Sequence, residues 1–123
     1  MIGVLTWMGI GVFGALGALA RFRVATAVTA RALSDFPVGT FLVNVTGSFV
    51  LGLLTGLSLT SDLMLVLGTG FLGGYTTFST WMVETLRLGE DGEWLLFYLY
   101  LAGSMLAGLA AAGAGWLIGG LVA

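Results

Sequence analysis

The residues of this chain that could do chemistry gather in one stretch, Gly70 to Glu84, which reads GFLGGYTTFSTWMVE. Paired glycines at positions 73 and 74 precede a run of hydroxyl side chains, and within that run Phe78 and Trp81 lie three positions apart. A helix broken in mid-membrane exposes backbone groups that must find partners in protein, water or an ion. Two interpretations of the glycine pair stay open. It eases helix packing, or it unwinds the helix and frees carbonyl oxygens for a hard cation such as Na⁺.

The side chains of this stretch favour weak binding of a small anion. The edge of an aromatic ring is electropositive, so Phe78 and Trp81 can meet an anion without offering it a full positive charge. The hydroxyls of Thr77 and Thr80 are hydrogen-bond donors close to one helix face, which also carries Glu84. Such a lining binds a dehydrated ion weakly enough to release it, as conduction requires.

Two polar stripes elsewhere in the chain extend this pattern. Thr40, Asn44 and Ser48 are spaced i, i+4 and i+8, which places them on one face of a helix. An asparagine in mid-membrane must form hydrogen bonds or cost roughly several kcal/mol, so Asn44 either bridges two helices or lines a pathway. Tyr100 and Ser104 form the second stripe, although a tyrosine near a helix end can also be an anchor at the membrane interface.

Charged residues within the apolar segments are few. Arg21 lies inside or near the end of the first segment, where it is either functional or reaches the interface together with Arg23. Glu84 is the one acidic residue that falls within an expected span, and it lies near the end of the third segment, where simple exposure is the alternative.

The composition of the chain indicates that these residues belong to a membrane domain. The chain has 123 residues, of which 59% are hydrophobic and 8% charged, and it contains no His and no Cys. Its mean hydropathy is +1.10, and a soluble domain would carry about 25% charged residues. With no nucleophile–base pair or metal-ligand set we expect no enzyme activity, and a net charge of −2 gives no reason to expect a nucleic-acid partner.

Four segments are apolar enough to cross a membrane, which takes about 20 residues each. We expect an all-α protein with one transmembrane domain over residues 1–123 and helices at about 3–30, 38–59, 63–88 (broken near 73–77) and 94–122. No positive charge precedes the first segment, so we expect a span there and not a cleaved signal peptide. Pro37 is expected in the first turn of the second helix. Asp62 is a candidate cap for the third.

Short connections between four helices place both termini on one side of the membrane, and no soluble domain is expected. Arg31 and Arg87 fall on the opposite side, which by the positive-inside rule predicts outward-facing termini. So few arginines give only a weak preference for one membrane orientation. A chain that inserts in both orientations would need such a weak preference. Four short helices also enclose little volume, so we expect at least a dimer. Small residues four apart, as at Gly52 and Gly56, fit close packing either between chains or within one.

With these residues assembled, the chain resembles the Fluc/CrcB-type fluoride channels. The resemblance covers nearly the whole chain and rests on four motifs: GALARF at Gly17–Phe22, PVGTFLVNVTGSF at Pro37–Phe49, GGYTTFSTWMVE at Gly73–Glu84 and YLAGS at Tyr100–Ser104. It implies an antiparallel, dual-topology dimer with two fluoride pathways at the subunit interface and a structural Na⁺ at the centre.

The resemblance also assigns roles to individual residues. Asn44 matches the pore asparagine and Phe78 the first of two pore phenylalanines, while Trp81 stands where the second phenylalanine is usual. Gly73 and Thr76 match the positions whose backbone carbonyls hold Na⁺. The fluoride pathway is then expected to include Asn44, Phe78, Trp81, Thr40, Tyr100, Ser104, Thr77, Thr80, Glu84 and Arg21. Gly108 lies where a further hydroxyl would be expected.

The function implied is passive export of F⁻ from the cytoplasm, driven by the membrane potential, by a multi-pass protein of the inner (plasma) membrane. Its partners would be the fluoride ion, the bilayer and a second copy of the chain. The alternatives are a small multidrug-type, proton-coupled exporter and a structural membrane subunit. The exporter would need a carboxylate in the middle of a helix to bind cationic drugs and protons, whereas Glu84 is near a helix end. The structural subunit would need neither the broken helix nor the aromatic pair.

Overall fold

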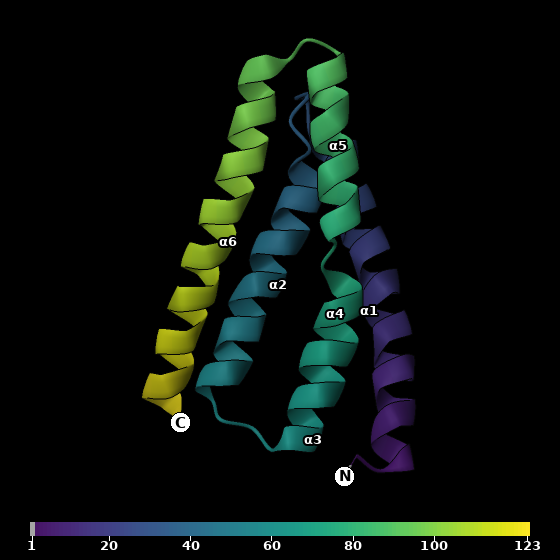
Figure 1. Cartoon of the computed structure of the whole chain (residues 1–123), viewed down its shortest axis with the longest axis vertical. Coiled ribbons are helices and arrows are strands. Elements are labelled where there is room, and N and C mark those ends of the chain that lie inside the picture. Colours follow the sequence, from purple (N-terminus) through teal and green to yellow (C-terminus); the bar gives the residue numbers. More distant parts are fainter. Residues whose placement is uncertain (1) are drawn as a thin grey trace.

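The computed structural model describes residues 2–123 of the chain, and the regular elements among them are helices (Figure 1). Three are long and unbroken: α1 (Val4–Arg31), α2 (Val38–Gly56) and α6 (Trp94–Val122). Between α2 and α6 the chain forms a fourth column from four shorter pieces: α3 (Ser61–Met64), η1 (Leu65–Leu72), α4 (Gly73–Tyr75) and α5 (Phe78–Glu90).

The three long helices have the length and the surface of membrane spans. The 28 residues of α1 and the 29 of α6 extend about 42 Å at 1.5 Å per residue, more than the roughly 30 Å of a bilayer's hydrocarbon core. Apolar side chains point outward along them, including Leu5, Leu106 and Leu121, each more than half exposed. Such faces suit lipid. All three are long and apolar enough to cross a membrane, and α2 ends at Gly56, before the expected residue 59.

The fourth column contains the predicted break, but the glycines do not make it. Gly73 has helical backbone angles (φ −62°, ψ −37°), whereas Thr76 and Thr77 are extended. Threonine is branched at Cβ and tolerates extended backbone well. Gly74 serves packing instead, because a Cβ at that position would collide with the backbone of Gly14 on α1.

Two further features of this column differ from the sequence-based expectation. The helix cap before α3 is Thr60, whose hydroxyl oxygen accepts a hydrogen bond from the Leu63 N–H at 3.4 Å. The expected cap, Asp62, is wrong, because the helix begins at Ser61 and Asp62 lies in its first turn. η1 is a π-helix of eight residues that leads directly into the broken region, and such wide turns are frequent at functional sites.

Glycines allow α2 and α6 of one chain to pack closely. Gly52 and Gly56 of α2 pack on α6, and Gly115 and Gly119 of α6 pack on α2. A Cβ at any of the four would meet the backbone of the other segment. Small residues allow this approach in lipid. The small-residue pairs of the sequence are therefore explained by contacts inside the chain and give no support to a dimer.

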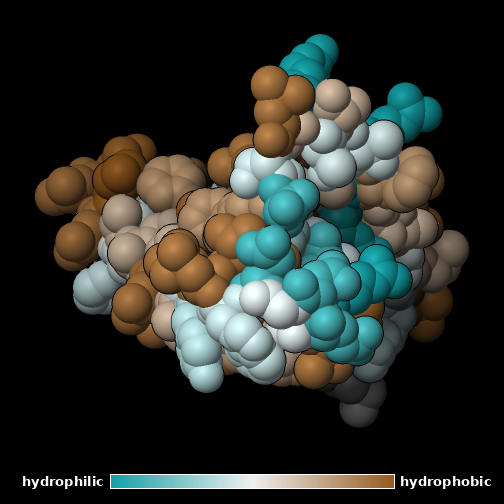
Figure 2. Space-filling model, turned by 90° about the horizontal axis from the view of Figure 1, so that it is seen from above, coloured by the Kyte–Doolittle hydropathy of each residue, from teal (hydrophilic) through white to brown (hydrophobic). Residues whose placement is uncertain are grey.

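The two ends of the molecule differ in polarity. Both ends of the chain lie at the same end of the bundle, as expected, and the α5–α6 connection lies at the other (Figure 1). Figure 2 looks onto that other end and shows hydrophilic residues gathered over it. A cavity there is lined by residues that include Asp35, Arg87, Asp91 and Glu93.

The glycine contacts give a prediction about stability. Gly115→Ala places a methyl group against the Phe49 carbonyl and 2.8 Å from the Leu53 nitrogen, and we expect a cost of about 1–3 kcal/mol. The thermal unfolding midpoint of the detergent-solubilised protein should therefore fall. Gly113→Ala is the matched control on the same helix, because nothing lies within 4 Å of its added methyl. Equal midpoints for the two variants would contradict this packing.

Candidate functional site

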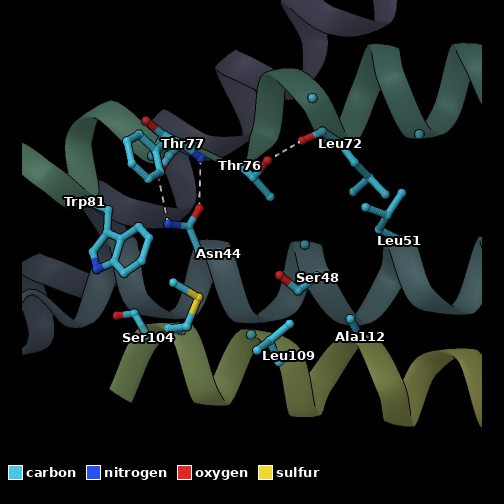
Figure 3. A pocket seen from close by; sticks show the side chains of 16 residues that line it. Asn44, Ser48, Leu51, Leu72, Thr76, Thr77, Trp81, Ser104, Leu109 and Ala112 are labelled. Atoms are coloured by element: carbon cyan, nitrogen blue, oxygen red, sulfur yellow. Dashed lines mark hydrogen bonds between the residues drawn. The ribbon is translucent and has the colours of Figure 1, made fainter. Parts of the chain in front are cut away.

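The centre of the site is a pair of hydrogen bonds between Asn44 on α2 and the backbone of Thr77 at the break. Asn44 Nδ2 donates to the Thr77 carbonyl oxygen at 2.9 Å, and the Thr77 N–H donates to Asn44 Oδ1 at 2.8 Å. Figure 3 shows the amide group facing the break with both bonds drawn. One orientation of the amide satisfies both backbone groups, so the positions of nitrogen and oxygen are fixed by their partners.

The local sequence around Asn44 allows the break to lie against α2. Gly47 follows Asn44 by one turn, and a Cβ there would collide with the Thr76 methyl and lie 3.2 Å from the Tyr75 ring. On the other edge of α2, the Tyr75 and Thr46 hydroxyls are hydrogen-bonded at 3.1 Å. The open interpretation of Asn44 as a bridge between helices is therefore borne out in the geometry, and the same side chain also lines a groove.

The hydrogen bonds at the break leave carbonyl groups of the turn before it without their helical donors, among them those of Gly73 and Thr76. In a continuous α-helix the N–H of residue i+4 donates to the carbonyl of residue i. The Thr77 N–H instead donates to Asn44, and the Thr80 N–H donates to Thr77 Oγ1 at 3.2 Å. The carbonyls of Gly73 and Thr76 thus lose the donors that a continuous helix would supply.

A groove of about 400 Å³ opens beside the break, between α2, η1, α5 and α6. Of the residues predicted for the site, it is lined by Asn44, Gly73, Thr76, Thr77, Phe78, Trp81 and Ser104. Figure 3 shows Trp81, Asn44 and Ser104 toward one end of it and Leu51 and Ala112 toward the other. The Ser104 hydroxyl oxygen is buried and has no hydrogen-bond partner among the described residues, a condition that costs about 1–3 kcal/mol.

One wall of this groove is apolar and was missed by reasoning from the sequence. Leu51, Leu72, Met105 and Leu109 contribute to it. Apolar side chains are common throughout spanning helices, so nothing in the sequence distinguishes these four from residues that face lipid. Ser48 on α2 also lines the groove, and it was singled out only as part of the Asn44 stripe.

The two aromatic residues of α5 meet edge to face. Their ring centroids lie 5.6 Å apart with an angle of 88° between the ring planes. Phe78 is 70% exposed in the single chain. Trp81 is half-buried, and its indole N–H donates to the Tyr100 carbonyl oxygen of α6 at 3.3 Å.

Tyr100 links the groove to the cavity at the polar end. Its side chain is completely buried, so the interpretation as an interface anchor is wrong. Its hydroxyl donates to Glu84 Oε1 at 3.1 Å, and Glu84 lines the end cavity of about 400 Å³. Since Trp81 lines the groove and Glu84 lines the end cavity, the polar contacts of Tyr100 run from one to the other.

Four predicted site residues lie outside both cavities, the first being the buried Tyr100 described above. Thr40 is buried on α2, Thr80 is exposed on α5 and Arg21 is half-buried on α1. None of them is among the residues that line the groove or the end cavity. Their place in a pathway stays a prediction.

The Asn44–Thr77 pair gives a prediction. Asn44→Asp puts a carboxylate oxygen opposite the Thr77 carbonyl, where two acceptors repel, so we expect a loss of about 1–3 kcal/mol or more and a lower unfolding midpoint. Thr55→Val is the control, because the Thr55 hydroxyl donates only to Leu51 of its own helix. An Asn44→Asp protein as stable as the control would show that the pair does not hold the break.

Comparison of the sequence with known proteins identifies its family. The family model described as CrcB-like protein, Camphor Resistance (CrcB), matches residues 8–116. Fluoride-specific ion channel FluC 2 of Mycobacterium tuberculosis (strain CDC 1551 / Oshkosh) is 48% identical over 109 residues, covering 89% of this chain and 86% of that protein. Fluoride-specific ion channel FluC of Nitratidesulfovibrio vulgaris is 49% identical over 106 residues, covering 82% and 86%. Because both kinds of match extend over most of its length, the chain belongs to the CrcB family.

Proposed function

We propose that this protein is a fluoride channel of the plasma membrane that exports F⁻ passively from the cytoplasm. Its relatives are named fluoride-specific ion channels, and family membership argues for a channel and against an enzyme. The observation that carries the proposal is the groove beside the helix break, where hydrogen-bond donors and two aromatic side chains meet and where no Lys or Arg is among the lining residues.

The donors in this groove suit a small, dehydrated anion. The Asn44 NH₂ group has two hydrogens, and one of them is used by the Thr77 carbonyl, so the other is available to an ion. The Ser104 hydroxyl lacks a protein partner among the described residues and can donate as well. Partial charges of this kind offset dehydration without trapping the ion, whereas a guanidinium or ammonium group would hold it too tightly for rapid release.

The N-terminus of α5 adds a positive electrostatic potential that favours an anion. The first N–H groups of a helix have no acceptor within it, and the helix dipole is positive at that end. Asn44 and Thr77 Oγ1 occupy the N–H groups of Thr77 and Thr80. Those of Phe78 and Ser79 also belong to this positive end, which lies where the groove meets the break. A negative ion is favoured there.

A second copy of the chain, inserted in the opposite orientation, would complete the pathway. The groove is open on one side and Phe78 is largely exposed, so a single chain gives the ion a wall but no enclosed pore. We infer an antiparallel dimer with two pathways at its interface, in which the α3–α5 column forms a fourth, broken span. From the groove, F⁻ would pass Trp81 and Tyr100 toward Glu84 and the end cavity. A negative cytoplasm would drive it outward.

The carbonyls of Gly73 and Thr76 fit a structural Na⁺ between the two copies. A hard cation prefers oxygen ligands, and these two oxygens have lost their helical donors to Asn44 and Thr77 side-chain atoms. Gly73 is exposed in the single chain, so its backbone is open to a partner. A bound Na⁺ would supply positive charge that compensates the freed carbonyls where the two breaks meet.

The proton-coupled exporter is less well supported. Such a protein needs a carboxylate at mid-membrane that alternates between a proton and a cationic substrate. Glu84 lies in the cavity at the polar end and accepts a hydrogen bond from Tyr100. The groove at mid-membrane is lined by no acidic side chain.

The channel proposal is tested by anion efflux from liposomes that contain the purified protein. We expect rapid F⁻ efflux with little Cl⁻ efflux, because the donors of the groove match a small ion best. Phe78→Ile removes the ring edge and should slow F⁻ efflux. Phe22→Ile should not, since Phe22 is matched to Phe78 in exposure (69% and 70%) but lies on α1 outside both cavities. Comparable F⁻ and Cl⁻ rates in the wild type would exclude a fluoride-selective channel.

The Na⁺ proposal is tested by stability in different salts. Protein purified without Na⁺ should unfold at a lower temperature in KCl than in NaCl of equal concentration. The difference should depend on Na⁺ concentration, because binding to the folded state stabilises it by mass action. Equal midpoints in the two salts at every concentration would argue against a resident Na⁺.

A further inference from the structure

Helix α5 depends on side-chain contacts for its position, because the break separates it from α4. Its N-terminus is held by the two bonds between Asn44 and Thr77. Along its length, two hydrogen bonds join it to α6, and both involve Tyr100. Trp81 donates to the Tyr100 carbonyl oxygen at 3.3 Å, and Glu84 accepts from the Tyr100 hydroxyl at 3.1 Å.

Trp81 and Glu84 are three residues apart on α5, so they lie on neighbouring turns of one face. They hold the completely buried Tyr100 at two points, one on the backbone and one at the tip of the side chain. A phenylalanine at position 81 could not make the first of these bonds, because its ring carries no donor. The indole N–H is therefore a feature of this chain that alters how α5 is fixed.

The same N–H also decides what Trp81 can offer an ion. An indole has a single donor, and here that donor is used by the Tyr100 carbonyl. The ring is held at a second point by its edge-to-face contact with Phe78, at 5.6 Å and 88°. The hydrogen bond and the ring contact leave the indole little freedom to rotate. The indole therefore restricts where the Phe78 ring can lie.

We propose that Trp81 is a positioning residue: its indole N–H ties α5 to the Tyr100 carbonyl of α6 and thereby fixes the Phe78–Trp81 pair and the width of the groove. The N–H does not meet the permeating ion. The consequence for transport rests on the fluoride-channel proposal, whereas the tether itself does not. Loss of the donor with the ring size unchanged should loosen the aromatic pair and weaken discrimination between F⁻ and the larger Cl⁻.

The test separates the N–H from the size of the ring. Trp81 is replaced by 3-benzothienylalanine, which has the shape of tryptophan with sulfur in place of the N–H, and separately by phenylalanine. Trp116 of α6, which is 57% exposed and lies outside both cavities, receives the same two replacements as the matched control. Initial rates of F⁻ and Cl⁻ efflux are measured in liposomes for each protein.

We expect the ratio of F⁻ to Cl⁻ efflux rates to fall about three- to tenfold in the Trp81 benzothienylalanine protein. This range corresponds to the free energy of one hydrogen bond. The Trp116 proteins should keep the wild-type ratio. An unchanged ratio at position 81 would overturn the positioning role, because the replacement removes only the donor.

A second measurement does not depend on transport. The ultraviolet resonance Raman spectrum of the wild type minus that of Trp81→Phe isolates the Trp81 indole, whose N–H vibrations report hydrogen bonding. A hydrogen-bonded indole is expected, and a free N–H would overturn the tether. If the wild type passed no F⁻ at all, the fluoride-channel proposal would fail while the Raman spectrum still decided whether α5 is tied to α6.

Discussion

The structure depends on two hydrogen bonds between one asparagine side chain and the backbone of one residue. A helix that breaks within a membrane leaves N–H and C=O groups without water to satisfy them, and each costs several kcal/mol. Asn44 satisfies both backbone groups of Thr77 at once. The break can therefore persist, and it does so at Thr77, the residue whose N–H and C=O both pair with the amide.

The polar groups that give the site its chemistry follow from this arrangement. Because the Thr77 N–H turns to α2, carbonyl oxygens are freed on one side of the break, while the positive N-terminus of α5 lies on the other. The freed oxygens suit a cation and the helix N-terminus suits an anion. Asn44 also keeps one amide hydrogen for the groove, so a residue needed for the fold can serve the pathway too. Contacts to Tyr100 then fix α5 against α6.

Much of this was predictable from the sequence, because long apolar runs indicate membrane spans and a cluster of hydroxyls inside one of them indicates an interruption. The spans and the break near residues 73–77 were expected, and residues of the asparagine and aromatic stripes do meet in one groove. The partner of Asn44 was not predictable, since it lies 33 residues away and depends on how α2 packs against the break. The sequence left two interpretations of the glycine pair open, and the structure supports the packing one for Gly74, because a Cβ there would meet the backbone of α1. The π-helix of η1 was missed because an apolar run carries no sign of its hydrogen-bond spacing.

The most direct test of this arrangement is the distance between the Asn44 side-chain nitrogen and the Thr77 carbonyl carbon in a lipid bilayer. Rotational-echo double-resonance NMR measures it when ¹⁵N is placed in asparagine side chains and ¹³C in threonine carbonyls, with Asn44 being the one asparagine of the chain. The hydrogen bond predicts a nitrogen–carbon distance of about 4 Å, given an N···O bond near 2.9 Å and a C=O length near 1.2 Å. Dephasing that fits this distance, and that disappears in Thr77→Ser, where position 77 no longer carries the ¹³C label, would support the bond between Asn44 and the break. A distance beyond about 6 Å, too long for any hydrogen bond, would contradict it.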